Sequence, residues 1–131
     1  MRKKVVAVFI LLVVYLSMSY AESFWDGGVN IIVNYAWEKQ DLSPNWVSFC
    51  EERLRYSFYT MGAFADVPVK KLSNDDVRLI NKALQRYEVE KDEIYTVVIT
   101  HGSSVKAFCV LITSIKGDSY WWEWVGRSGV H

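Results

Sequence analysis

Residues 100–104, Thr-His-Gly-Ser-Ser, are the one short segment whose side chains could act together in catalysis. An imidazole beside a hydroxyl can serve as the base that activates a nucleophile, as in a serine hydrolase. Such a site also needs a third group that orients the base, and no acidic residue lies near His101 in the sequence. Gly102 and the serines are also typical of a tight turn. We therefore predict a hairpin here, no catalytic residues and no enzyme, with a small hydrolase only the third-ranked function.

Metal ligands and paired carboxylates are equally scarce. The two histidines are His101 and His131, and neither has a second ligand at a spacing typical of metal sites. Acidic pairs occur at residues 51–52, 75–76 and 92–93, but glycoside hydrolysis needs two carboxylates that face each other across a cleft. Neighbouring residues on a helix point in different directions. The sequence therefore predicts no metal site and no cofactor.

Cys50 and Cys109 are the only cysteines of the chain. In an exported protein an even number of cysteines favours a disulfide, and two independent buried thiols are the alternative. A bridge between them would close a loop of about 60 residues, for which chain entropy predicts a stabilisation of about 4 kcal/mol. We expect the disulfide.

The first 21 residues predict export. They begin with basic residues, continue with an uncharged apolar run over residues 5–16, and end with small residues at Ser19 and Ala21. This is the pattern of a cleavable signal peptide. The apolar run is shorter than the roughly 20 residues of a membrane-spanning helix, so no stable anchor is expected after cleavage. Residues 22–131 are then expected to form one domain in a bacterial periplasm, with secretion as the alternative.

Charge argues against one class of partner. Without the three basic residues of the leader, 12 Lys and Arg stand against 15 Asp and Glu, a net charge of −3. Proteins that bind nucleic acids need a basic surface, so no nucleic-acid partner is expected.

Two helices are predicted in the middle of the chain. Ser43 and Pro44 favour the start of the first, and Gly62 favours its end. The apolar stripe of this helix includes Cys50, which indicates that the cysteine faces the core. Ser73 predicts the cap of the second helix, with acidic residues in its first turn. Its inward residues are predicted to be Val77, Ile80, Ala83, Leu84 and Tyr87.

The last third of the chain predicts three strands, over residues 94–101, 104–116 and 119–126. Each spacer is a two-residue pair that begins with glycine, which favours tight hairpins with His101 opposite Ser104 and Lys116 opposite Ser119. Residues 24–40 fit both a helix and a strand, and the helix is favoured. The expected fold is α+β, with two or three helices on a C-terminal three-stranded antiparallel meander and one disulfide.

The predicted register divides the meander into two apolar faces. The first face is expected to carry Ile94, Val98, Val105, Ala107, Cys109, Leu111, Tyr120, Trp122 and Trp124. The second is expected to carry Tyr95, Val97, Ile99, Phe108, Val110, Ile112, Trp121 and Val125, with His101, Lys106 and Glu123 at its rim. The helix with Cys50 should cover the first face. The second needs another cover, either the N-terminal segment, a second copy, a protein partner or a ligand.

These features predict an exported, non-enzymatic binding protein that recognises another protein, of an inhibitor, immunity or envelope-assembly type, or that forms a homodimer. The expected binding residues are Tyr95, Lys106, Phe108, Val110, Trp121 and Glu123. The alternative is a carrier of a small apolar or carbohydrate ligand, with Trp121, Trp122 and Trp124 lining its site.

Overall fold

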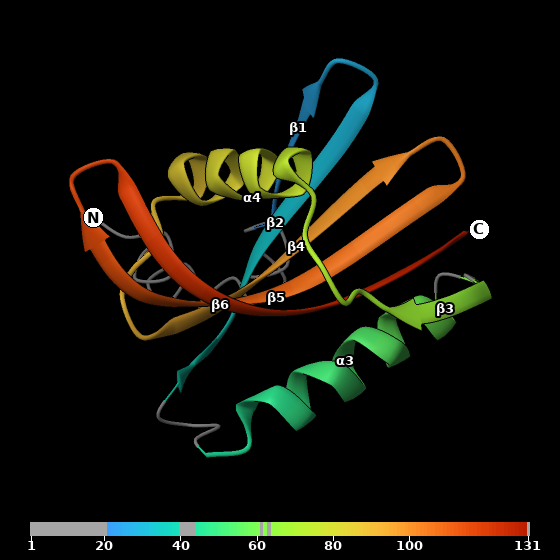
Figure 1. Cartoon of the computed structure of the whole chain (residues 1–131), viewed down its shortest axis with the longest axis horizontal. Coiled ribbons are helices and arrows are strands. Elements are labelled where there is room, and N and C mark those ends of the chain that lie inside the picture. The colour runs from blue at the N-terminus through green and yellow to red at the C-terminus, as the bar shows by residue number, and fades with distance from the viewer. Residues whose placement is uncertain (1–20, 40–43, 61, 63, 131) are drawn as a thin grey trace, which may run out of the picture.

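A computed structural model describes residues 21–39, 44–60, 62 and 64–130, so most of the predicted signal peptide and Ser43 lie outside the described residues. Six antiparallel strands form one sheet in the order β1-β2-β4-β5-β6-β3, with one helix on each face (Figure 1). The elements are β1 (Glu22–Asp26), β2 (Val29–Glu38), α3 (Trp46–Thr60), β3 (Phe64–Pro68), α4 (Asn74–Tyr87), β4 (Glu93–His101), β5 (Ser104–Lys116) and β6 (Ser119–Val130).

The favoured helix over residues 24–40 is wrong, because this segment forms the hairpin of β1 and β2. Gly27 has a φ of 63°, a conformation that glycine adopts without strain and that a tight hairpin requires. β2 then pairs with β4 along most of its length, a contact between segments far apart in sequence. The predicted C-terminal three-stranded meander is therefore wrong as well, since β4, β5 and β6 belong to a six-stranded sheet. The α+β class is confirmed, and the described residues form two helices.

The register of the first predicted hairpin is confirmed, with His101 opposite Ser104. The second hairpin begins as predicted, with Lys116 opposite Ser119, but its register shifts between Ile112 and Ser114. A bulge of one residue reverses the faces of all side chains that follow it.

The bulge makes the predicted face of the β6 aromatics wrong. Tyr120, Trp122 and Trp124 pack with the buried cluster of Phe108, on the face predicted for Trp121. Val125 instead packs with the cluster of Cys109.

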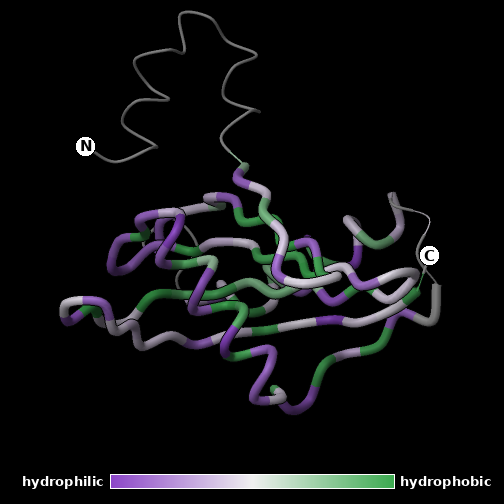
Figure 2. The backbone as a smooth tube through the Cα atoms, turned by 90° about the horizontal axis from the view of Figure 1, so that it is seen from above, coloured by the Kyte–Doolittle hydropathy of each residue, from purple (hydrophilic) through white to green (hydrophobic). Residues whose placement is uncertain are grey.

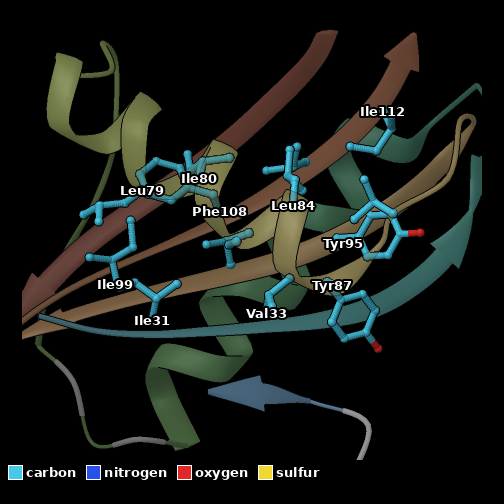
Figure 3. Packing of buried hydrophobic residues seen from close by; sticks show 14 of the residues in the cluster. Ile31, Val33, Leu79, Ile80, Leu84, Tyr87, Tyr95, Ile99, Phe108 and Ile112 are labelled. Carbon is cyan, nitrogen blue, oxygen red and sulfur yellow. The ribbon is translucent and has the colours of Figure 1, made fainter. Parts of the chain in front are cut away.

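α4 covers the second face of the sheet (Figure 3). Ser73 caps this helix as predicted, since its hydroxyl accepts from the Asp76 amide while the Asp76 carboxylate accepts from the Ser73 amide. The buried residues of this cluster are Phe24, Ile31, Val33, Leu79, Ile80, Ala83, Leu84, Tyr87, Val89, Tyr95, Val97, Ile99, Phe108, Val110 and Ile112. Figure 2, coloured by hydropathy, shows several hydrophobic stretches that cross the middle of the molecule.

α3 packs on the first face, mainly over β5 and β6, so the predicted cover of this face is confirmed. The predicted disulfide is wrong: Cys50 and Cys109 are both free thiols, and each is fully buried. The Cys109 Sγ lies 3.9 Å from the carbonyl oxygen of Cys50. A disulfide requires a set separation and direction of both Cβ atoms, which burial in one interface does not guarantee.

Both thiols should resist alkylation in the native chain and react after unfolding without a reductant. Burial shields both thiols from the reagent, and the hydrogen bond with the Cys50 side chain, together with burial, also raises the pKa of Cys109. Intact mass after iodoacetamide treatment should show no adduct on the native protein and two adducts on the denatured, unreduced protein. An absence of adducts on the denatured, unreduced protein would contradict the free thiols.

Candidate functional site

The six binding residues predicted from the sequence do not share one surface. Tyr95, Phe108 and Val110 are buried beneath α4. Lys106 lies on the same face, where its ammonium contacts the Asp76 carboxylate. Trp121 is half exposed on the opposite face.

Glu123 is also exposed, and its β5 partner Leu111 belongs to the cluster beneath α3, so Glu123 lies on that face as well. The second face of the sheet, for which the sequence left several covers open, is covered by α4.

The three tryptophans of β6 do not line one ligand site either. The indole N–H of Trp122 donates to the Asn81 side chain at 2.9 Å. The Trp124 ring makes an edge contact with Phe108, at a centroid distance of 6.0 Å. Trp122 therefore helps to attach α4, and Trp124 packs against the cluster beneath that helix, while Trp121 lies on the other side of the sheet.

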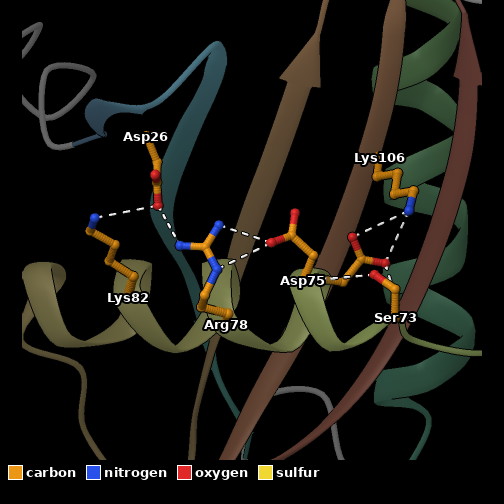
Figure 4. Close-up of polar contacts among 7 residues, drawn as sticks. Asp26, Ser73, Asp75, Arg78, Lys82 and Lys106 are labelled. Atoms are coloured by element: carbon orange, nitrogen blue, oxygen red, sulfur yellow. Dashed lines mark hydrogen bonds and ion pairs between the residues drawn. The ribbon is translucent and has the colours of Figure 1, made fainter.

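A polar network joins α4 to the β1–β2 hairpin (Figure 4). Arg78 donates to Asp26 at 2.7 Å and to Asp75 at 2.9 Å, and Lys82 contacts Asp26 at 3.3 Å. The hydrogen bond from Arg78 lowers the pKa of the Asp26 carboxyl below its ordinary value. These charges pair with each other, so the network positions the helix rather than presenting a binding site.

A small cavity of about 180 Å³ lies beside His101 and the start of α4. Ser104, Asp75 and Asp76 also line it. Among the described contacts, Asp75 is held by Arg78 and Asp76 by Lys106 and Ser73, and no hydrogen bond of the His101 ring occurs. The described residues also contain no cluster of three His, Cys, Asp or Glu side chains arranged for a metal ion. The cavity therefore lacks an oriented pair of base and nucleophile.

A larger groove of about 410 Å³ lies between α3 and the part of the sheet that this helix leaves open. It is lined by Asn34, Tyr35, Ala36, Trp37, Arg53, Leu54, Ser57, Thr96, Val98 and Ala107. Arg53 is the only charged residue among them. No ion pair joins Arg53 to any described carboxylate, and its guanidinium instead lies over an aromatic ring.

A bulge in β2 builds one wall of this groove. Tyr35 pairs with Tyr95 and Trp37 pairs with Ile94, so the register shifts at Ala36 and the Trp37 side chain moves to the face of α3. There the Phe49 ring makes an edge contact with it, at a centroid distance of 4.8 Å.

The guanidinium of Arg53 lies over the same indole, 4.9 Å from its centroid. Sequence alternation alone would have placed Trp37 on the other face with Val33, so the groove could not be predicted.

The outer side of α3 carries an unusual set of exposed aromatic side chains. Phe49, Tyr56 and Tyr59 have exposed fractions of 43, 65 and 80%. Their spacings of seven and three residues place them on one stripe, opposite the buried stripe that contains Cys50 and Leu54. We call these three residues the aromatic ridge. The sequence carries this signal in the helical spacing of the three aromatic residues, beside the apolar stripe that predicts the buried side.

Comparisons with known proteins identify no relative of the chain. It matches no protein-family model, no curated protein and no solved structure. Neither helix of the described residues is long and apolar enough to cross a membrane. The aromatic ridge and the groove are thus the two surfaces from which a function can be inferred.

Proposed function

We propose that this chain is an exported, non-enzymatic protein that binds another protein through the aromatic ridge of α3. The observation that carries this proposal is the exposure of Tyr56 and Tyr59 on the solvent side of a helix whose other side is already packed. A helix at the surface of a globular protein normally presents polar residues to water. Tyrosine is enriched among the residues that dominate binding energy in protein interfaces, because it buries a large area and keeps a polar group.

Charged residues beside the ridge support recognition of a protein rather than of a purely apolar surface. Glu51, Glu52, Arg53 and Arg55 are exposed on the same helix as the aromatic ridge. A polar rim around aromatic anchors is the usual anatomy of a protein interface. The partner is expected in the periplasm or outside the cell, because the leader over residues 1–21 predicts export.

The double substitution Tyr56→Ser and Tyr59→Ser should weaken binding of the partner at least about tenfold without unfolding the domain. Full-length protein with a C-terminal tag would be expressed in the exporting cell and cross-linked in the envelope, and the captured partner would then be titrated against the purified variants. Both side chains are exposed, so circular dichroism should show an unchanged melting temperature.

Trp25→Ser is the matched control, since Trp25 is 68% exposed but lies on β1, away from α3. This variant should bind the partner like the unmodified protein. Equal binding by the tyrosine variant and the unmodified protein would contradict the proposal. A failure of the unmodified protein to capture any partner would also contradict it.

A further inference from the structure

We propose that the groove between α3 and strands β2 and β4 binds a small ligand with one carboxylate and a neutral, hydrogen-bonding body. This site shares only Phe49 with the aromatic ridge, through the contact of its ring with Trp37, and neither Tyr56 nor Tyr59 lines the groove. Its volume of about 410 Å³ lies within the range of roughly 300–1,000 Å³ typical of small-molecule sites.

The carboxylate is assigned from the single charge of the groove. Arg53 is its only charged lining residue, and the described residues provide that guanidinium with no carboxylate partner. Guanidinium groups bind carboxylates through two parallel hydrogen bonds, which are stronger than neutral hydrogen bonds. In this groove an anionic ligand would therefore be attracted by the Arg53 guanidinium and repelled by no acidic lining side chain.

Trp37 makes this arginine better suited to a ligand than an ordinary surface arginine. The indole supports the face of the guanidinium, and Phe49 in turn contacts the indole. A stacked guanidinium keeps its N–H groups at its edge, where they remain available to an acceptor. Because Arg53 is already positioned, a carboxylate would bind with a smaller loss of side-chain entropy than at a mobile arginine.

The other lining residues define the body of the ligand. Asn34, Ser57 and Thr96 are neutral and polar, while Leu54 and Val98 contribute apolar surface. The Ser57 hydroxyl donates to the Arg53 carbonyl at 3.0 Å, so its oxygen can still accept. A fatty acid would leave these polar groups without partners, which costs free energy.

An ammonium group is also disfavoured, because no acidic residue lines the groove to balance its charge. The remaining chemistry is shared by a sugar acid and by the C-terminal residues of a peptide whose amine is acylated or part of an amide bond.

Two probes with this chemistry distinguish the two sources. The exported protein would be labelled with ¹⁵N and titrated with glucuronate or with N-acetyl-alanyl-alanine, following amide shifts of Asn34, Arg53 and Thr96. Binding of one probe identifies its source, and binding of both supports the shared chemistry. The neutral counterparts, glucuronate methyl ester and the peptide amide, should bind at least tenfold more weakly, because each keeps the body and removes the charge.

Arg53→Gln should weaken binding of the carboxylate probe at least tenfold. Arg55→Gln is the matched control, since Arg55 is exposed on the same helix but does not line the groove. The affinity of this variant for the carboxylate probe should be unchanged. The ridge variant with Tyr56→Ser and Tyr59→Ser should also keep its affinity for the probe, which separates this site from the protein-binding proposal.

Three results would overturn the site: no shift of the groove amides with either acid, equal affinity for acid and neutral counterpart, or equal losses in the Arg53 and Arg55 variants. The comparison of each acid with its neutral counterpart uses the unmodified protein. It therefore tests whether the groove recognises the carboxylate even where a variant fails to fold.

Discussion

Replacing Gly126 with valine is expected to destabilise the fold by about 3 kcal/mol, because the added side chain would overpack the core. Gly126 lies on β6 directly opposite Phe108 on β5. A Cβ atom at this position would lie 2.5 Å from Cδ1 and 2.7 Å from Cε1 of the Phe108 ring. The ring is fully buried and cannot move away, since it contacts Trp124 and belongs to the cluster beneath α4.

Gly28→Ala is the matched control for this substitution. The nearest atom to a Cβ at Gly28 is the Nε2 of His101 at 3.8 Å, an ordinary contact, and the residue does not need a positive φ. Urea unfolding of both variants gives the comparison, with the control expected within about 0.5 kcal/mol of the unmodified protein. A loss below about 1 kcal/mol for Gly126→Val would show that Phe108 does not pack over this position.

The parts of the fold that could be predicted are those with a local cause. Ser73 and the acidic residues after it specify the start of α4 by hydrogen bonds within four residues. Gly102 and Gly117 specify two hairpin turns, and both have the positive φ that such turns use. β1 and β2 have a weaker local signal, and what stabilises them is the pairing of β2 with β4, about 60 residues later in the chain.

The bulges in β2 and β5 explain most of what could not be predicted. Each adds one residue to a strand and reverses the side chains beyond it, at Ala36 in β2 and between Ile112 and Ser114 in β5. No Gly or Pro marks either place in the sequence. The first bulge creates the Trp37–Arg53 contact of the groove, and the second moves two tryptophans of β6 into the core beneath α4. Strict alternation of side chains along a strand cannot predict a site that depends on such a register shift.

The second large effect is expected from Lys106→Met, which should destabilise the fold by about 2 kcal/mol because it removes a partly buried ion pair. Lys106 donates to both carboxylate oxygens of Asp76, at 3.2 and 3.0 Å, and the Asp76 residue is only 5% exposed. Removing the cation leaves a buried carboxylate without its ion pair, which costs about 3–5 kcal/mol at fully buried sites. The expected value is lower because the Lys106 side chain is 37% exposed and water screens the pair.

A double-mutant cycle separates the pair from the loss of either side chain alone. Asp76→Asn keeps a group that can take part in the cap with Ser73, and in combination with Lys106→Met it leaves no unpaired charge in the interface. The double variant should therefore be more stable than the lysine variant alone, by about 1 kcal/mol in urea unfolding. If the two single losses simply add, Asp76 and Lys106 do not interact across the junction of α4 and β5. If they couple as expected, Lys106 attaches α4 to the sheet, and the residue predicted from the sequence to bind a partner stabilises the fold instead.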